Sequence, residues 1–316
     1  MLINASFSKY LFVISFFLIS LIIGSENKEK SYFDCPCPHI IAHQGSSLDL
    51  PPNTLKAFQL SIDQGADIIE LDIWRSKDGI WVVVHDKNLE RITGVEKNIT
   101  ELTFQEIQSL DVGYNFTNSS GNYSYRNKNY RIPSLEQVFK MFNNEKINIE
   151  IKGNSKRGIS DLVKLIRKYN IEIKGDNTLG LSDLVDLVIK YQMERKLLVV
   201  SSSYRVIKKF RKITNYEIAT AASKPDIMKM IYLGKIPGFK FHFDAFQLPF
   251  YSEKVKNLGF LNKDWINSMQ TKGLEVHYWT IDNVEDIKNA VTMGVNGIIT
   301  NKPKTAYDVL VQLGKR

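Results

Sequence analysis

Asp67-Ile-Ile-Glu-Leu-Asp-Ile-Trp74 is a stretch in which aliphatic and carboxylate side chains alternate along a predicted β-strand. Successive side chains of a strand point to opposite faces, so Glu70 and Asp72 share one face, and the apolar Ile69, Leu71 and Ile73 share the other. We expect the apolar face to pack against helices and the acidic face to point into the mouth of a barrel. Two neighbouring carboxylates are costly to bury without a cation, so the stretch predicts a metal site.

The segment Ile147–Lys152 repeats this alternation and places Asn148, Glu150 and Lys152 on one face. Glu150 is a candidate third metal ligand, and Lys152 is a candidate contact to a phosphate group. Three carboxylate ligands favour one hard divalent cation, Mg²⁺ or Ca²⁺, over zinc.

Two histidines follow apolar runs at predicted strand ends, His43 after Ile40–Ala42 and His85 after Val82–Val84. Imidazole titrates near neutral pH, so such a pair can take a proton from an attacking hydroxyl and give one to a leaving alkoxide. Asp86 lies beside His85 and is a candidate to orient its ring.

From residue 39 onward, short β-rich runs alternate with longer helical patterns, which predicts parallel strands and right-handed crossovers. Roughly eight such units over about 250 residues match the size of a (β/α)₈ TIM barrel. An open, doubly wound sheet is the alternative, but no Gly-x-Gly-x-x-Gly motif follows the first strand. The predicted strands are 39–43, 67–74, 80–85, 147–152, 197–201, 217–221, 245–248, 274–280 and 297–300, and the predicted helices are 54–64, 134–142, 160–169, 182–191, 204–211, 262–272 and 284–293.

One strand–helix unit is duplicated. The string Asn148-Ile-Glu-Ile-Lys-Gly153 recurs as Asn170-Ile-Glu-Ile-Lys-Gly175, and Gly158-Ile-Ser-Asp-Leu-Val163 recurs as Gly180-Leu-Ser-Asp-Leu-Val185. We interpret this as one duplicated strand–helix insertion into the barrel. The third ligand is then Glu150 or Glu172, and we favour Glu150 because a short loop connects its strand to the preceding helix.

Residues 1–25 contain the apolar run Leu11–Ile23 after Lys9 and predict a signal peptide or an uncleaved signal anchor. We expect a linker over residues 26–38 and the barrel over residues 39–316. Four glycosylation acceptor motifs agree with the secretory pathway, at Asn98, Asn115, Asn118 and Asn122. We therefore expect a protein that is secreted or anchored to the endoplasmic reticulum or another membrane.

The formal net charge of +8 favours anionic partners such as phosphate esters or phospholipid headgroups. The basic residues are scattered along the chain, which leaves a membrane surface as a candidate partner and argues against nucleic acid. The chain has only two cysteines, Cys35 and Cys37, and this indicates neither a disulfide framework nor a zinc site.

The order of several motifs over residues 39–312 resembles the glycerophosphodiester phosphodiesterase family, and most closely its eukaryotic, lysophospholipase D-like branch. The motifs are Ala42-His-Gln-Gly45, Pro52-Asn-Thr54, Gly65-Ala-Asp-Ile-Ile-Glu-Leu-Asp72, Lys77-Asp-Gly79, His85-Asp86, Arg131-Ile-Pro-Ser-Leu-Glu136, Ile149-Glu-Ile-Lys152, Trp279-Thr280 and Gly297-Ile-Ile-Thr300.

This resemblance implies a (β/α)₈ barrel that uses one divalent cation to hydrolyse a glycerophosphodiester or a lysophospholipid. The products would be the headgroup alcohol and a glycerol phosphate or lysophosphatidic acid. The implied site residues are an acid/base pair, His43 and His85, the metal ligands Glu70, Asp72 and Glu150, and substrate contacts from Gln44, Lys152 and Trp279.

Two positions depart from the family pattern. Gln44 stands where the family usually has arginine, and Pro52 stands where it usually has glutamate. Glutamine brings no charge, so we expect weaker phosphate binding. Two alternatives therefore stay open: a catalytically impaired barrel that acts as a secreted binding protein, and a sphingomyelinase D-like or phosphoinositide-cyclising barrel enzyme.

Overall fold

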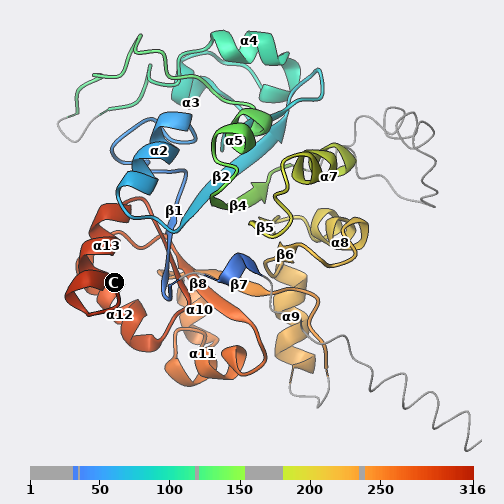
Figure 1. Ribbon diagram of the computed structural model, residues 1–316, viewed down its shortest axis with the longest axis vertical. Coiled ribbons are helices and arrows are strands. Elements are labelled where there is room, and N and C mark those ends of the chain that lie inside the picture. The colour runs from blue at the N-terminus through green and yellow to red at the C-terminus, as the bar shows by residue number, and fades with distance from the viewer. Residues whose placement is uncertain (1–30, 35, 118–120, 154–180, 235–238) are drawn as a thin grey trace, which may run out of the picture.

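The computed structural model describes residues 31–34, 36–117, 121–153, 181–234 and 239–316, and its strands form a barrel with helices around it (Figure 1). The barrel strands are β1 (His39–Ala42), β2 (Ile68–Arg75), β4 (Lys146–Ile151), β5 (Leu197–Val200), β6 (Ala219–Thr220), β7 (Ala245–Pro249), β8 (Glu275–Trp279) and β9 (Gly297–Thr300). They are parallel and follow the order β6-β5-β4-β2-β1-β9-β8-β7. A parallel bridge between Ala221 and Ala245 joins the two ends of this order, so the predicted TIM barrel is confirmed as a nearly closed one.

A ninth strand, β3 (Trp81–Val83), lies outside this path and pairs antiparallel with β2. We expected the strand over residues 80–85 to pair parallel with its neighbours, as the other barrel strands do. This prediction was wrong, because β3 is antiparallel to β2. The connection between Arg75 and Trp81 is far too short for a crossover helix, so it forms a hairpin. The hairpin returns the chain to the level of Asp72, whose carbonyl accepts a hydrogen bond from the Val84 N–H at 2.9 Å.

Helices cover the outside of the strands, and polar side chains cap several of them at the first turn. The Thr54 side chain accepts a hydrogen bond from the Ala57 N–H, and the Asn283 side chain accepts one from the Asp286 N–H. We find no helix among the described residues with the length and apolar character needed to cross a bilayer. The longer helices are α2 (Leu55–Asp63), α5 (Leu135–Met141), α7 (Leu181–Lys190), α8 (Tyr204–Ile213), α9 (Lys224–Leu233), α11 (Lys263–Gln270), α12 (Val284–Met293) and α13 (Pro303–Gln312), and the short ones are α3 (Glu90–Thr93), α4 (Phe104–Ser109), α10 (Glu253–Asn257), η1 (Ser31–Phe33) and η2 (Ile99–Glu101).

The two copies of the sequence repeat contribute different elements. The strand of the first copy is β4, and the helical part of the second copy begins α7 at Leu181. Glu150 therefore lies on a barrel strand. Glu172 and the predicted helix 160–169 lie outside the described residues.

The amino-terminal end of the barrel is filled by η1, the short blue helix among the strands in Figure 1. Its Tyr32 is only 1% exposed and packs with Ile68, Ala219 and Ala245, which are the first residues of their strands. The alanines leave room for the tyrosine ring, which takes the place of larger barrel residues. Part of the stretch expected to be a linker thus packs inside the barrel.

Candidate active site

Three carboxylates converge near the carboxyl ends of β2 and β4. Asp72 lies directly opposite Glu150 in the register of the two strands, and Glu70 is on the same face as Asp72. One oxygen of each residue lies within 4.8 Å of the other two. The two β2 carboxylates are buried and Glu150 is half-buried. The structure thus brings together the three predicted metal ligands.

The electrostatics of this cluster fit a cation. Burial and then the charge of Asp72 raise the pKa of Glu70 well above its ordinary value. A hydrogen bond from the Gln44 N–H and the charge of Lys152 oppose this shift but do not cancel it. A hard divalent ion prefers oxygen ligands and supplies the positive charge that the cluster needs.

The loop after β1 holds the carboxylates in place. Gln44 donates its backbone N–H to Glu70 Oε2 at 2.9 Å and its side-chain amide to Asp72 Oδ2 at 2.8 Å. Asn53 donates to the same Asp72 oxygen at 3.1 Å. Gln44 and Asn53 have φ angles of 56° and 58°, which cost an L-residue about 1–2 kcal/mol each. The side chain expected to contact substrate, Gln44, therefore contacts a predicted metal ligand, Asp72.

Lys152 lies beside the same carboxylates. Its Nζ is 3.1 Å from Asp72 Oδ1 and 2.9 Å from Glu150 Oε2. Burial lowers the pKa of Lys152, but the two carboxylates outweigh burial and the net shift is upward. The ammonium group is therefore charged at neutral pH and lies next to the predicted metal site.

His43 follows β1, and one of its ring nitrogens is fixed by Asn301. Nδ1 lies 2.7 Å from Asn301 Oδ1, while the Asn301 amide nitrogen donates to Asp282 at 2.7 Å. An amide oxygen only accepts hydrogen bonds, so Nδ1 carries the proton and Nε2 is left for a substrate. Sequence reasoning missed Asn301, although it directly follows the predicted strand 297–300.

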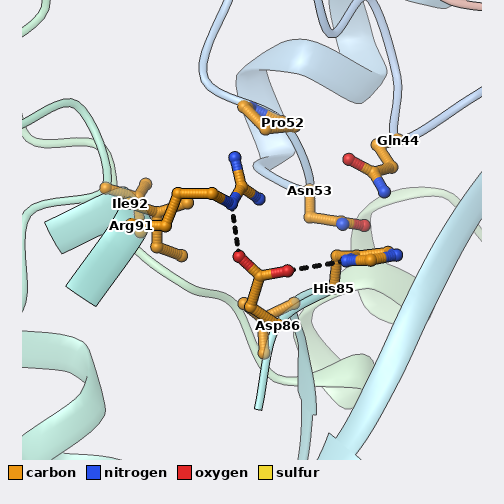
Figure 2. Close-up of a pocket in the computed structure, with 9 residues that line it drawn as sticks. Gln44, Pro52, Asn53, His85, Asp86, Arg91 and Ile92 are labelled. Atoms are coloured by element: carbon orange, nitrogen blue, oxygen red, sulfur yellow. Dashed lines mark hydrogen bonds and ion pairs between the residues drawn. The ribbon is translucent and has the colours of Figure 1, made fainter. Parts of the chain in front are cut away.

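His85 follows β3 and is held in the same way by a carboxylate. Its Nδ1 lies 2.7 Å from Asp86 Oδ1, and Arg91 donates to the other Asp86 oxygen at 2.5 Å (Figure 2). Burial raises the pKa of Asp86, but hydrogen bonds from Arg91 and His85 outweigh it and the pKa is lowered. Asp86 thus stays ionised and orients His85 with Nε2 free of Asp86, as we expected from its position.

A pocket lies between the loop after β1 and the segment after β3. Figure 2 shows Arg91 between Pro52 and Asp86, with the Gln44 and Asn53 amides toward His85. Gln44 and Pro52 are uncharged, so Arg91 supplies the guanidinium charge that lines this pocket. We did not predict Arg91 as a site residue. The lining residues are Gln44, Pro52, Asn53, Val84, His85, Asp86, Arg91, Ile92 and Val112.

Two tryptophans complete this end of the barrel. Trp279 ends β8 and is 43% exposed, and it does not line the pocket of Figure 2. Trp74 donates its indole N–H to the His85 carbonyl at 2.8 Å. A Cβ at Gly153 would lie 2.5 Å from the Trp74 ring, so glycine is required where β4 ends.

Residues 43–305 match the model of the glycerophosphoryl diester phosphodiesterase family. The chain belongs to this family. It is 27% identical to a glycerophosphodiester phosphodiesterase of Caldanaerobacter subterraneus subsp. tengcongensis, over 86% of this chain and 97% of the relative. It is 28% identical to human lysophospholipase D GDPD1, over 85% of each chain.

Solved structures of the family have the same fold. A glycerophosphodiester phosphodiesterase from Agrobacterium tumefaciens superposes with a TM-score of 0.62 at 20% identity, covering 85% of this chain and 99% of its own. A phosphodiesterase from Oleispira antarctica, solved with the product sn-glycerol-3-phosphate, gives 0.64 at 19% identity, covering 87% and 97%. Family membership confirms the enzyme class expected from the sequence, a phosphoric diester hydrolase of a metal-dependent family.

Proposed function

We propose that the enzyme hydrolyses glycerophosphodiesters and lysophospholipids with one Mg²⁺ or Ca²⁺ held by Glu70, Asp72 and Glu150. The products are the headgroup alcohol and a glycerol phosphate or lysophosphatidic acid. The observation that carries this proposal is the convergence of three carboxylates at the barrel mouth. The names of the glycerophosphodiester phosphodiesterase and lysophospholipase D relatives support it.

The side chains divide the chemistry between them. When bound, the cation neutralises the phosphate charge and polarises the P–O bond. Lys152 adds a second positive charge beside the phosphate. The Nε2 atoms of His43 and His85 move the protons: one accepts a proton from the attacking hydroxyl, and the other donates one to the headgroup oxygen as its bond to phosphorus breaks. The attacking hydroxyl is water, or it is the substrate's own glycerol hydroxyl. In the second case the headgroup leaves first and a cyclic phosphate forms, which water then opens to the same monoester while the two histidines exchange roles.

Exposed apolar side chains at the barrel mouth support a lysolipid substrate. Leu48, Tyr251 and Trp279 follow or end β1, β7 and β8 and are 48%, 61% and 43% exposed. They come from one side of the barrel, because these strands lie within four consecutive positions of the strand order. A single acyl chain or a membrane surface is the partner that such a surface fits.

Headgroup release tests the proposal. Choline release is measured from lysophosphatidylcholine and from glycerophosphocholine, with and without a chelator. We expect chelator-sensitive release from both substrates. The variant W279A should raise KM for lysophosphatidylcholine more than for glycerophosphocholine, whereas Y232A, at a 72% exposed residue of α9, should change neither. Release that persists in chelator would contradict the metal-dependent reaction.

A non-catalytic binding protein is the second candidate, and Gln44 is the observation that favours it. Its side-chain amide is engaged by Asp72 at 2.8 Å, and it has no charge to offer a phosphate. This candidate predicts saturable binding of glycerophosphocholine without choline release from any diester. A cyclic phosphate product from sphingomyelin would instead indicate the headgroup-cyclising type of barrel.

We also propose that the protein enters the secretory pathway. The apolar run before residue 25 supports this, and so do exposed acceptor asparagines at Asn115 and Asn122. A mobility shift after treatment with a glycosidase that removes N-linked glycans, smaller in an N115Q/N122Q variant than in the wild type, tests the two acceptors.

A further inference from the structure

A second group of metal-binding side chains lies at the amino-terminal end of the barrel, away from the carboxylates. Cys37 precedes β1, His39 is the first residue of β1, and Glu275 is the first residue of β8. One ligand atom of each lies within 4.8 Å of the other two. His39 is fully buried, Glu275 is half-buried and Cys37 is exposed.

The spacing of these atoms fits a tetrahedral ion. Cys37 Sγ lies 3.6 Å from His39 Nε2, which lies 3.2 and 3.1 Å from the two Glu275 oxygens. Ordinary zinc bond lengths in a tetrahedron place sulfur and nitrogen ligands about 3.5 Å apart, and nitrogen and oxygen ligands about 3.3 Å apart. Little movement is therefore needed to seat an ion between them.

The surroundings of His39 also point to a cation. Its Nδ1 lies 3.2 Å from the Pro36 carbonyl oxygen, while Nε2 faces the Glu275 carboxylate. Both oxygens only accept hydrogen bonds, and a neutral imidazole has a single N–H. The other nitrogen therefore faces a second ring proton, the proton of the Cys37 thiol 3.6 Å away, or a metal ion that replaces either proton. A ring whose Nδ1–H donates to a backbone carbonyl while Nε2 binds the ion is the usual arrangement of a metal-binding histidine.

The Glu275 carboxylate is oriented from its inner side by His277. His277 Nε2 lies 2.7 Å from Glu275 Oε2, and the Gln247 amide lies 3.3 Å from His277 Nδ1. A Cβ at Gly297 would lie 2.8 Å from the His277 ring, so glycine makes room for this histidine.

We propose that Cys37, His39 and Glu275 bind a zinc ion that fastens the segment before β1 to β8. The thiolate and the carboxylate balance the charge of the ion, and binding releases the thiol proton. Sulfur and imidazole ligands distinguish this site from the all-oxygen site at the barrel mouth. Water takes the fourth position, on the exposed side of Cys37. The cysteine spacing indicated no zinc site because Glu275 is distant in sequence, 236 positions after His39.

Cobalt substitution tests the proposal without reference to turnover. The purified chain, reduced with a phosphine, is titrated with Co²⁺ and then with Zn²⁺. We expect a thiolate-to-cobalt charge-transfer band that saturates at one equivalent and is displaced by zinc. The oxygen ligands at the mouth cannot produce this band, so it is expected to persist in E70Q even if that variant is inactive.

Two matched cysteine variants locate the thiolate. C37S should abolish the band and weaken zinc binding more than about tenfold, and C35S should leave both unchanged. Cys37 is exposed, so C37S is expected to fold, and circular dichroism checks this. The absence of a charge-transfer band in the wild-type chain, its survival in C37S, or its loss in C35S instead would overturn the assignment.

Discussion

Each histidine of the candidate site is fixed through Nδ1, but the partners differ in charge. His43 faces the amide oxygen of Asn301, and His85 faces the carboxylate of Asp86. With Nδ1 engaged in both rings, Nε2 is the atom of each ring left to exchange a proton with a substrate.

The substitution H85Q should remove turnover without unfolding the protein. We expect kcat to fall about 10²–10⁴-fold, the usual contribution of one acid or base. The His85 side chain is 46% exposed, so the melting temperature should hardly change. The exposed His242, changed to glutamine, is the matched control and should retain full activity. Unchanged kcat in H85Q would exclude this residue from the chemistry.

The substitution E70Q should separate stability from metal binding. Glutamine keeps the shape of the side chain but removes a buried charge beside Asp72, so the metal-free protein should melt at a higher temperature than the wild type. The stabilisation that Mg²⁺ or Ca²⁺ gives the wild type should disappear. Thermal melts with and without chelator measure both effects. A wild-type protein that neither ion stabilises would contradict the predicted ligand set.

The substitution D86N should reveal the lowered pKa of Asp86 in the way the melting temperature depends on pH below neutrality. A carboxyl group whose pKa is lowered on folding stabilises the fold above its unfolded value, and this contribution is lost as the pH falls through the folded value. The wild type should therefore melt above D86N near neutral pH. The two melting temperatures should converge as the pH falls below the ordinary value of 3.8. A difference that grows with acidity would contradict the sign of the shift.

At the scale of elements, the β2–β3 hairpin and the end of β4 position His85 together. Trp74, on β2, holds the His85 carbonyl, and Gly153, with a φ of +78°, lies against the Trp74 ring. Within the described part of the chain, neither residue hydrogen-bonds to the three carboxylates. Both act by fixing where the hairpin returns to the barrel mouth.

The substitution G153A should destabilise the protein by about 2–4 kcal/mol, from backbone strain and from contact with the indole. It should also lower kcat, because a displaced Trp74 releases the His85 carbonyl. The control is G294A at a φ of +84° with nothing within 4 Å, which should cost only the strain, about 1–2 kcal/mol. Urea unfolding measures both variants. Equal destabilisation in the two would show that Trp74 is not compressed.

The sequence predicted the barrel and the carboxylates because both follow from local periodicity. Alternation along β2 and β4 is enough to put Glu70, Asp72 and Glu150 on inward faces, and strand–helix alternation is enough for parallel pairing. The sequence patterns did not predict the contacts between segments that are distant along the chain. Asn301 beside His43 and Arg91 beside Asp86 depend on how loops fold over the mouth, and no pattern marks them in advance.

Over the whole molecule, a column of polar side chains lies inside the barrel. Asn148 donates to Gln247, whose amide faces His277, and His277 in turn faces Glu275. These residues come from β4, β7 and β8, so the interior is bound by hydrogen bonds as well as by apolar packing. Around the outside, apolar side chains of the helices and of the outward strand faces form the larger clusters.

The substitution Y32A should lower stability while leaving the chemistry intact. Removing a buried aromatic ring of this size costs about 3–5 kcal/mol, because the surrounding strand starts cannot close the cavity. The kcat of the folded fraction should match the wild type, since Tyr32 lies at the other end of the barrel. Y232A, at an exposed tyrosine, is the stability control. A melting temperature unchanged in Y32A would show that η1 does not support the fold.

Because η1 packs in the amino-terminal end of the barrel, an attachment before Ser31 would join the enzyme at that end. The candidate active site lies at the opposite end. If that attachment were anchored in a bilayer, the barrel mouth would face away from the membrane. The enzyme would then have to reorient on its anchor to reach lipid in the same membrane. Substrates in solution, or in a facing membrane, would meet an open mouth directly.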